Sequence, residues 1–256
     1  MNKLLLQSTA RVPRRQAGFS LIELMIAIVI AMVVTAGAIA VFGNMRSTFT
    51  TQDKLGQLQD NQRLALSILN TTVQSAGFFP DPTVAAHVAD QVFPATAAAS
   101  ANSDGTVFAA EGVIIGTGAA SAASDVLSVR FSGSTRDGVM DCQGKPFSQA
   151  PSTVTLLYAV NTFEVINKQL TCRVNGGAAV ALIENVSSMK VSYLVAKSAT
   201  TYAYMDAPSV TAGSYWPSVI GTRITLQFID PLKTGNQALP YSNTQIINLM
   251  NKSSST

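Results

Sequence analysis

An apolar run near the N-terminus restricts the possible folds of this chain more than any other feature. Residues 24–43 are 20 successive residues without a charged side chain. As a helix that rises ~1.5 Å per residue, this run spans ~30 Å, which is the thickness of the hydrocarbon core of a bilayer. Glu23 stands at its edge, and a carboxylate costs about 2.5–3.5 kcal/mol at the bilayer centre. We therefore expect a membrane-spanning helix whose Glu23 needs a positively charged partner.

A short segment with two arginines leads into this run. Residues 14–24 read RRQAGFSLIEL, and cutting the chain between Gly18 and Phe19 would create an amine close to Glu23. At these residues the sequence resembles the type IV pilin signature. The resemblance implies cleavage after Gly18 by a prepilin peptidase on the cytoplasmic side and methylation of the Phe19 amine. It also implies that Glu23 pairs with the Phe19 amine of a neighbouring subunit in a filament.

Two other kinds of N-terminal signal also combine basic residues with an apolar run. An ordinary signal anchor that happens to carry Glu23 is the alternative that remains. A secretory signal fits less well, because the apolar run is too long and no small-x-small cleavage site follows within it.

The positive charge of the chain is concentrated before the expected cut. The formal net charge is +3, but the first 18 residues hold four basic and no acidic side chains. The remaining 13 basic and 14 acidic side chains give a net charge of −1. The basic leader should keep the N-terminus cytoplasmic, so that everything after Gly43 is exported. No global basic surface remains to indicate a nucleic-acid partner, and the scattered arginines and lysines, Arg130 included, are read as a mixed, solvated surface.

The helical pattern continues beyond the apolar run. One face is apolar at helical spacing, and Gln52, Asp53, Gln57, Asp60 and Arg63 occupy the other. Gly77 is suited to the first position after a helix, and Pro80 follows. The pattern predicts one helix over residues 19–76, whose second half packs on a sheet. The apolar stripe consists of Leu55, Leu58, Ala65, Leu69, Val73 and Ala76.

Strand patterns begin at residue 125. Turn signals and small-residue tracts in residues 78–124 predict short irregular elements. Strands are predicted at residues 126–131, 153–160, 163–166, 169–174, 179–183, 189–195 and 220–229, with a tight hairpin at Asn167-Lys168. Short connections between strands favour an antiparallel sheet. Residues 232–256 are interpreted as a polar tail with one apolar patch at 246–250.

Cys142 and Cys172 both lie in the part expected to be exported. In an oxidising compartment they predict one disulfide, with two free thiols as the alternative. The closed loop of about 30 residues is worth roughly 3–4 kcal/mol in the chain-entropy model. The two cysteines with His87, the only histidine, do not form a tetrahedral metal set. We expect no metal and no cofactor, and we identify no catalytic set, so an enzyme is not predicted.

Several local runs resemble the PilW branch of the minor pilins. The resemblance implies an α+β type IV pilin fold, in which a long N-terminal helix packs on an antiparallel β-sheet domain. The expected divisions are a leader at 1–18, a membrane or filament-core half-helix at 19–43, an amphipathic half-helix at 44–77, a variable loop region at 78–124 and a sheet domain with a disulfide at 125–256. The runs are residues 125–127 with 129–130, 141–144, 170–172, 183–186 with 189–193, Trp216 and 219–224, together with 58–61 and 63–66 ahead of 76–77.

The expected function is that of a minor type IV pilin that primes or caps pilus assembly, supporting twitching, adhesion and DNA uptake. The implied partners are a prepilin peptidase, other minor pilins, the major pilin and an inner-membrane assembly platform, and nucleic acid is not expected as a direct partner. The chain would cross the inner membrane once, with its C-terminal domain periplasmic, before joining the pilus tip. Two alternatives stay open: a minor pseudopilin of type II secretion, and a membrane-anchored adhesin that never polymerises.

Overall fold

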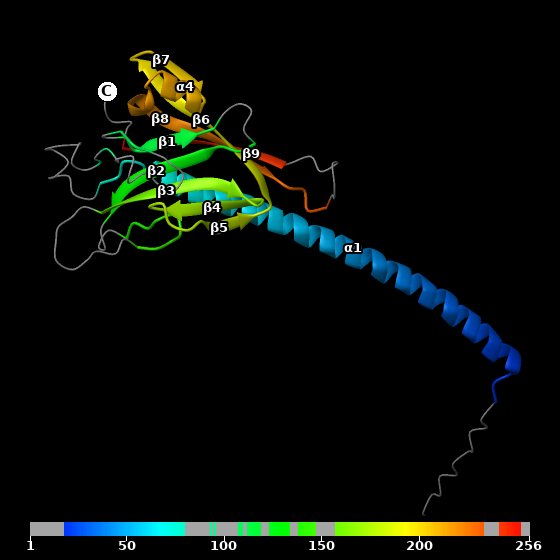
Figure 1. Ribbon diagram of the computed structural model, residues 1–256. Coiled ribbons are helices and arrows are strands. Elements are labelled where there is room, and N and C mark those ends of the chain that lie inside the picture. The colour runs from blue at the N-terminus through cyan, green and yellow to red at the C-terminus, as the bar shows by residue number, and fades with distance from the viewer. Residues whose placement is uncertain are drawn as a thin grey trace, which may run out of the picture. The chain divides into compact units, whose positions relative to one another are not determined.

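The chain consists of two units that are described separately. The computed structural model describes residues 18–79, 93, 95, 107–109, 112–118, 123–133, 138–146, 157–232 and 241–251. Unit 1 is Met1–Gln52 and unit 2 is Asp53–Thr256. One long helix, α1 (Leu21–Gln74), begins in unit 1 and ends in unit 2, and the described strands form two antiparallel sheets in unit 2 (Figure 1). The predicted α+β class with a long N-terminal helix and antiparallel pairing is confirmed.

Both ends of α1 follow from local chemistry. The carbonyl of Ser20 accepts hydrogen bonds from the amides of Glu23 (3.0 Å) and Leu24 (3.2 Å), so regular helix begins at Leu21, two residues after the predicted start. The helix ends at Gln74, and Gly77 adopts φ 73°, a left-handed conformation that glycine adopts without a Cβ penalty. The helix is therefore two residues shorter than predicted at each end.

The second half of α1 packs through the predicted stripe. Its members Leu58, Ala65, Leu69 and Val73 are buried within unit 2, as is Ala76 just beyond the helix, whereas Leu55 is only partly buried. The polar residues predicted for the opposite face are exposed or nearly so. The 3.6-residue period thus identified correctly which side of the helix contributes to the core.

The five-stranded sheet has the order β1-β2-β3-β4-β5. The β3–β4 hairpin turns at Asn167 (φ 51°) and Lys168 (φ 63°), both left-handed, as the tight hairpin predicted here requires. A strand at 114–117 appears inside the region predicted to be irregular. The strands are β1 (Ile114–Thr117), β2 (Val126–Gly133), β3 (Leu157–Ile166), β4 (Gln169–Val174) and β5 (Val180–Glu184).

Strand β2 is buried on both faces, which its sequence does not suggest. Arg130 is 0% exposed, so its assignment to a solvated surface is wrong. Its guanidinium donates to the carbonyls of Phe93 (3.0 Å), Ala109 (2.9 Å) and Gly112, and lies over the rings of Phe93 (5.4 Å to the centroid) and Phe108 (4.7 Å). These contacts come from residues far upstream in the chain, so no local pattern could reveal them.

The four-stranded sheet has the order β7-β6-β8-β9. Its last strand, β9 (Tyr241–Asn248), pairs with β8 from Gly221↔Asn248 to Phe228↔Tyr241, so the interpretation of this region as a tail is wrong. Ile247 and Leu249 are buried there. The remaining elements are β6 (Val186–Ser198), β7 (Thr201–Met205), α4 (Ala207–Ala212), the 3₁₀ turn η2 (Trp216–Ser218) and β8 (Val219–Phe228).

Polar groups join the two sheets along the first part of β6, which β7 does not reach. The amide of Asp125 donates to the carbonyl of Met189 (2.8 Å), and its carboxylate accepts from the amide of Val191 (2.9 Å) and pairs with Lys190 (3.2 Å). The chain itself crosses from β5 to β6 through a single residue, Asn185, at φ 62°. An aspartate that the sequence offers only as the start of a strand therefore completes the hydrogen bonding of a second sheet.

Asp206 caps the short helix α4, and this leads to a prediction about pH. Its carboxylate accepts from the amide of Ser209 (3.1 Å), and the hydrogen bonds from Ser209 lower the pKa of Asp206. The capping contribution is thus present above the unfolded pKa of about 3.9 and is lost as pH falls through the lower folded value. We expect Asp206→Ala to cost about 1 kcal/mol at pH 7 and less at pH 2, measured by urea unfolding at both values. An equal cost at both values would contradict this account.

Candidate assembly site at the N-terminal junction

The predicted cleavage junction lies just before the helix. Gly18, Phe19 and Ser20 are non-helical and exposed, and the Phe19 side chain is 83% exposed. Regular structure begins at Leu21. A peptidase needs its substrate backbone unfolded and accessible, and the described part of this junction meets both conditions.

Glu23 occupies the first turn of α1. A carboxylate there interacts favourably with the positive end of the helix dipole. Among the described residues no cation lies within ion-pair distance of Glu23, since the two ion pairs found there are Arg173–Glu164 and Lys190–Asp125. Cleavage would place the new Phe19 amine four residues away in the chain, and each copy of the chain would carry one such amine and one such carboxylate.

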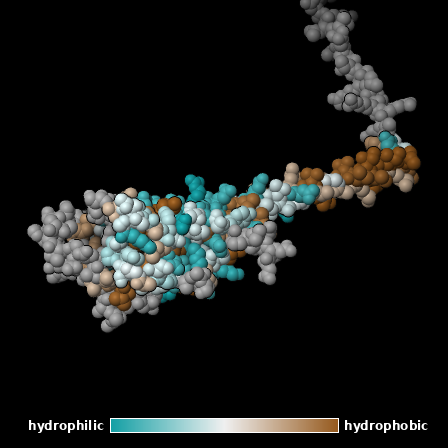
Figure 2. Space-filling model, turned by 90° about the horizontal axis from the view of Figure 1, so that it is seen from above, coloured by the Kyte–Doolittle hydropathy of each residue, from teal (hydrophilic) through white to brown (hydrophobic). Residues whose placement is uncertain are grey.

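The surface that follows Glu23 is apolar on every side. Every residue from 21 to 50 is exposed in the structure, and Figure 2 shows a brown hydrophobic band along this part of α1. By length and composition α1 is the one described helix able to cross a membrane, with a mean hydropathy of 2.8 over its best window. The hydroxyl of Thr35 donates to the carbonyl of Ala31 (2.7 Å), which satisfies it within the helix. Such a helix needs lipid or other apolar helices around it.

Large apolar side chains continue past the 20-residue run. Phe42, Met45 and Phe49 recur at spacings of three and four, all strongly exposed, and Arg46 lies between them. Shallow hollows of about 400 and 590 Å³ flank Met45 and Phe49. Because Met45 and Phe49 follow Gly43, the apolar surface extends beyond a single bilayer thickness, as lateral packing between helices would require.

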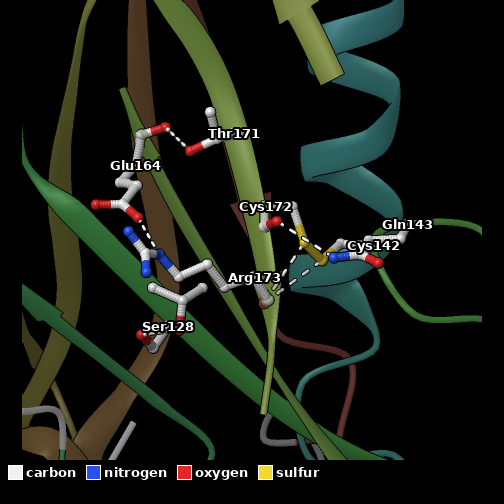
Figure 3. A network of polar contacts seen from close by, with 8 residues as sticks. Ser128, Cys142, Gln143, Glu164, Thr171, Cys172 and Arg173 are labelled. Carbon is white, nitrogen blue, oxygen red and sulfur yellow. Dashed lines mark hydrogen bonds and ion pairs between the residues drawn. A yellow bond between two sulfur atoms is a disulfide. The ribbon is translucent and has the colours of Figure 1, made fainter. Parts of the chain in front are cut away.

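The predicted disulfide is present in unit 2. Cys142 is bonded to Cys172 of β4, with 6.3 Å between their Cα atoms (Figure 3). The backbone amide of Cys142 donates to the side-chain oxygen of Asn161 (2.8 Å), and the side-chain amide of Gln143 donates to the backbone carbonyl of Cys172 (3.4 Å). Asp141 accepts from the amides of Gln143 and Lys145, which shapes the turn. The bond therefore fixes a tight, internally hydrogen-bonded loop onto the sheet.

An ion pair lies beside this loop on the neighbouring strands. Arg173 of β4 pairs with Glu164 of β3, and the Thr171 hydroxyl donates to the carbonyl of Glu164 (3.1 Å), as Figure 3 shows. Both charged side chains are partly exposed, so the pair contributes about 0–1 kcal/mol. Of the cations predicted to lie on a mixed, solvated surface, Arg130 is buried, and Arg173 and Lys190 are each part of an ion pair.

Removing the disulfide should lower the stability of unit 2. The loop it closes spans 30 residues, so the Cys142→Ser/Cys172→Ser double variant is expected to lose roughly 3–4 kcal/mol of unfolding free energy. The fluorescence of Trp216, the only tryptophan, follows urea unfolding of this unit. Reduction of the native protein should give the same loss, and Asp141→Ala, which only weakens the turn, should cost less. A double variant as stable as the native chain would contradict the prediction.

Some predicted features lie outside the described residues. These are the leader up to Ala17, His87, and most of the region 78–124. Among the described residues there is no group of three or more side chains able to hold a metal ion. Cleavage at Gly18, methylation at Phe19 and the pairing of Glu23 stay predictions.

A comparison with protein-family models finds a match that contains the same junction. Residues 13–39 match the family model of the prokaryotic N-terminal methylation motif, a stretch that contains Gly18, Phe19 and Glu23. No curated protein matches the chain. Among solved structures, the chain is similar to a type IV-like pilin from Thermus thermophilus, with a TM-score of 0.41 and 11% identity over 76% of this chain and 97% of that one. The motif and the apolar helix fit a membrane-anchored protein.

Proposed function

We propose that the chain is a minor pilin of a type IV pilus, processed between Gly18 and Phe19 and methylated on the Phe19 amine. The observation that carries this proposal is the methylation motif at residues 13–39, placed at the start of an exposed apolar helix. A motif of this kind is a substrate signature, and it lies where the backbone leaves regular structure. A prepilin peptidase and the inner-membrane assembly platform are the partners that act at this step.

Assembly then rests on charge neutralisation between copies. In the bilayer, Glu23 and the Phe19 amine of one subunit each carry an unmatched charge at the edge of an apolar run. Packing of α1 against α1 of another pilin lets the Glu23 carboxylate neutralise the neighbouring Phe19 amine as both leave the lipid. The stripe of Phe42, Met45 and Phe49 extends the packing surface. Unit 2 is carried on the outside of the filament.

The disulfide loop and the sheet sequences support the narrower assignment to the PilW branch. The resembling runs include the disulfide turn at 141–144 and the inter-sheet segment at 125–130. In that role the chain joins other minor pilins to prime or cap the pilus, with effects on twitching, adhesion and DNA uptake. A minor pseudopilin of type II secretion would carry the same junction, helix and sheets.

Mass spectrometry of sheared surface filaments tests the proposal. The expected result is an N-terminal peptide that starts at N-methylated Phe19. A protein that keeps residues 1–18 and never co-isolates with filaments would overturn it and would favour the non-polymerising adhesin. Deletion of the gene then separates the two filament systems: loss of pili and twitching supports the pilus, whereas loss of secreted enzymes with normal pili supports the pseudopilus.

A further inference from the structure

The four-stranded sheet has one face that the described residues leave uncovered. Side chains on the inner face of this sheet, among them Met189, Tyr193 and Leu226, are buried. The side chains that alternate with them along the strands point to the other face, and they are exposed or half-buried. We call this second set the outer face. It comprises Tyr202 and Tyr204 of β7, Lys190, Ser192, Leu194 and Ala196 of β6, Arg223, Thr225 and Gln227 of β8, and Ser242, Thr244, Ile246 and Asn248 of β9.

All the charged side chains in the four strands of this sheet are positive. Its four strands contain Lys190, Lys197 and Arg223 but no aspartate or glutamate. Lys190 is paired with Asp125 along the part of β6 that β7 does not reach, and Lys197 lies over the ring of Tyr215 at 5.6 Å. Arg223 therefore supplies the charge at the centre of the outer face, and the partner it suits carries negative charge.

An aromatic pair stands beside this arginine. The Arg223 guanidinium lies 4.2 Å from the ring centroid of Tyr204, and Tyr202 projects from the same side of β7 two residues away. Tyr202 is 52% exposed and Tyr204 is 37% exposed. Stacking on a ring holds a guanidinium in a fixed plane, which leaves its edge free for bidentate hydrogen bonds.

Short hydroxyl and amide side chains and the exposed Ile246 lie around this arginine. Ser192 and Ile246 are the register partners of Arg223 on either side. The hydroxyls of Thr225 and Thr244 lie 2.9 Å apart across the strands, and Asn248 stands opposite Gly221. The outer face thus has tyrosine rings at one edge, a cation in the middle and hydrogen-bonding groups beyond.

We propose that the outer face binds an extended acidic polysaccharide whose sugars are uronic acids. The C–H face of one pyranose ring packs on Tyr202, a carboxylate takes the bidentate hydrogen bonds of Arg223, and ring hydroxyls reach Ser192 and the Thr225–Thr244 pair. A single-stranded DNA would also stack on tyrosines, but the sugars within its chain carry no free hydroxyl groups for Ser192 and the Thr225–Thr244 pair. The inference concerns unit 2 alone and does not depend on the proposed function.

Binding is measured on the full chain in non-ionic detergent micelles by titration calorimetry. Polygalacturonate is the acidic probe, dextran the neutral one, and an oligothymidylate the nucleic-acid one. We expect saturable binding of polygalacturonate that weakens with added salt, and no binding of dextran. Absence of polygalacturonate binding, or tighter binding of oligothymidylate, would overturn the proposal.

Matched variants locate the site. Arg223→Gln is expected to weaken polygalacturonate binding about tenfold or more, and Arg223→Lys nearly as much because the fork geometry is lost. Tyr202→Ala should weaken it about fivefold. The controls are Lys168→Gln in the hairpin of the other sheet and Tyr241→Ala, an exposed tyrosine with the opposite side-chain direction, and both should bind within about twofold of the native chain.

The four substituted residues, two at the site and two in the controls, are all exposed. The variants should therefore unfold at the same urea concentration as the native protein. Equal weakening by test and control variants would show a diffuse charge effect and overturn the assignment of the site to the outer face. If the controls stay normal and the test variants lose binding, the assignment is supported whatever the filament experiments give.

Discussion

Glu23→Ala is expected to leave cleavage after Gly18 intact and to reduce incorporation of the chain into filaments at least tenfold. Cleavage reads the residues around the junction, and Gly18 and Phe19 are unchanged in this variant. Assembly in the proposed mechanism needs the carboxylate, because without it the Phe19 amine of the neighbouring subunit stays unpaired in an apolar environment. Leaving one partner of a buried charge pair alone costs about 3–5 kcal/mol, which is well over a hundredfold in an equilibrium constant. Immunoblots of sheared filaments against membrane fractions measure the ratio.

The control for this variant is Asp53→Ala. Asp53 is an exposed carboxylate on the same helix, but it lies in the polar part and bonds only to Gln57 (3.1 Å). It should incorporate normally. Glu23→Asp keeps the charge on a shorter side chain and should give an intermediate level. Native incorporation of Glu23→Ala would refute the proposed pairing, and accumulation of uncleaved Glu23→Ala would show that Glu23 acts in processing instead.

The features that local sequence determines were predicted well. The apolar run from Phe19 and the amphipathic stripe before Gly77 predicted the two ends of α1 to within two residues. Helical periodicity and a glycine stop are both properties of a few neighbouring residues. Asn167-Lys168 gave the β3–β4 turn for the same reason. The candidate assembly site is also local. Gly18, Phe19 and Glu23 lie within six residues, so the motif can be recognised from the sequence without knowledge of the fold.

The features that depend on distant contacts were not predicted. β9 contains Ser242, Asn243 and Thr244, so it resembles a polar tail until its pairing with β8 is known. The split into two sheets depends on one left-handed residue, Asn185, which no pattern of hydrophobicity marks. In each case the stabilising contacts are made with residues far away in the sequence, and a single sequence does not show which residues these are.

Arg130 is the clearest example, because an arginine in an alternating strand is ordinarily solvated. Here Phe93, Phe108, Ala109 and Gly112 supply its surroundings, and β2 is covered on the side that would otherwise face solvent. The neutral carbonyls and the faces of the two rings offer partial negative charge to the guanidinium, and hydrogen bonds to a charged group are worth about 1.5–3 kcal/mol each. The residue therefore anchors described parts of the upstream chain onto the sheet.

Arg130→Ala is expected to destabilise unit 2 by roughly 3–5 kcal/mol. It leaves the carbonyls of Phe93, Ala109 and Gly112 without this donor and opens a cavity where the largest fully buried side chain stood. Arg130→Met fills part of the cavity but donates nothing, so it should recover only about 1–2 kcal/mol of that loss. Urea unfolding followed by Trp216 fluorescence measures both.

Arg173→Ala is the matched control, since Arg173 is also an arginine on the five-stranded sheet but is partly exposed in its pair with Glu164. Its loss should cost about 1 kcal/mol or less. If Arg130→Ala costs no more than Arg173→Ala, the buried guanidinium contributes nothing beyond a surface ion pair and the anchoring role is wrong. If Arg130→Met equals the native stability, the side chain acts by filling space, and its hydrogen bonds are not what holds the upstream residues in place.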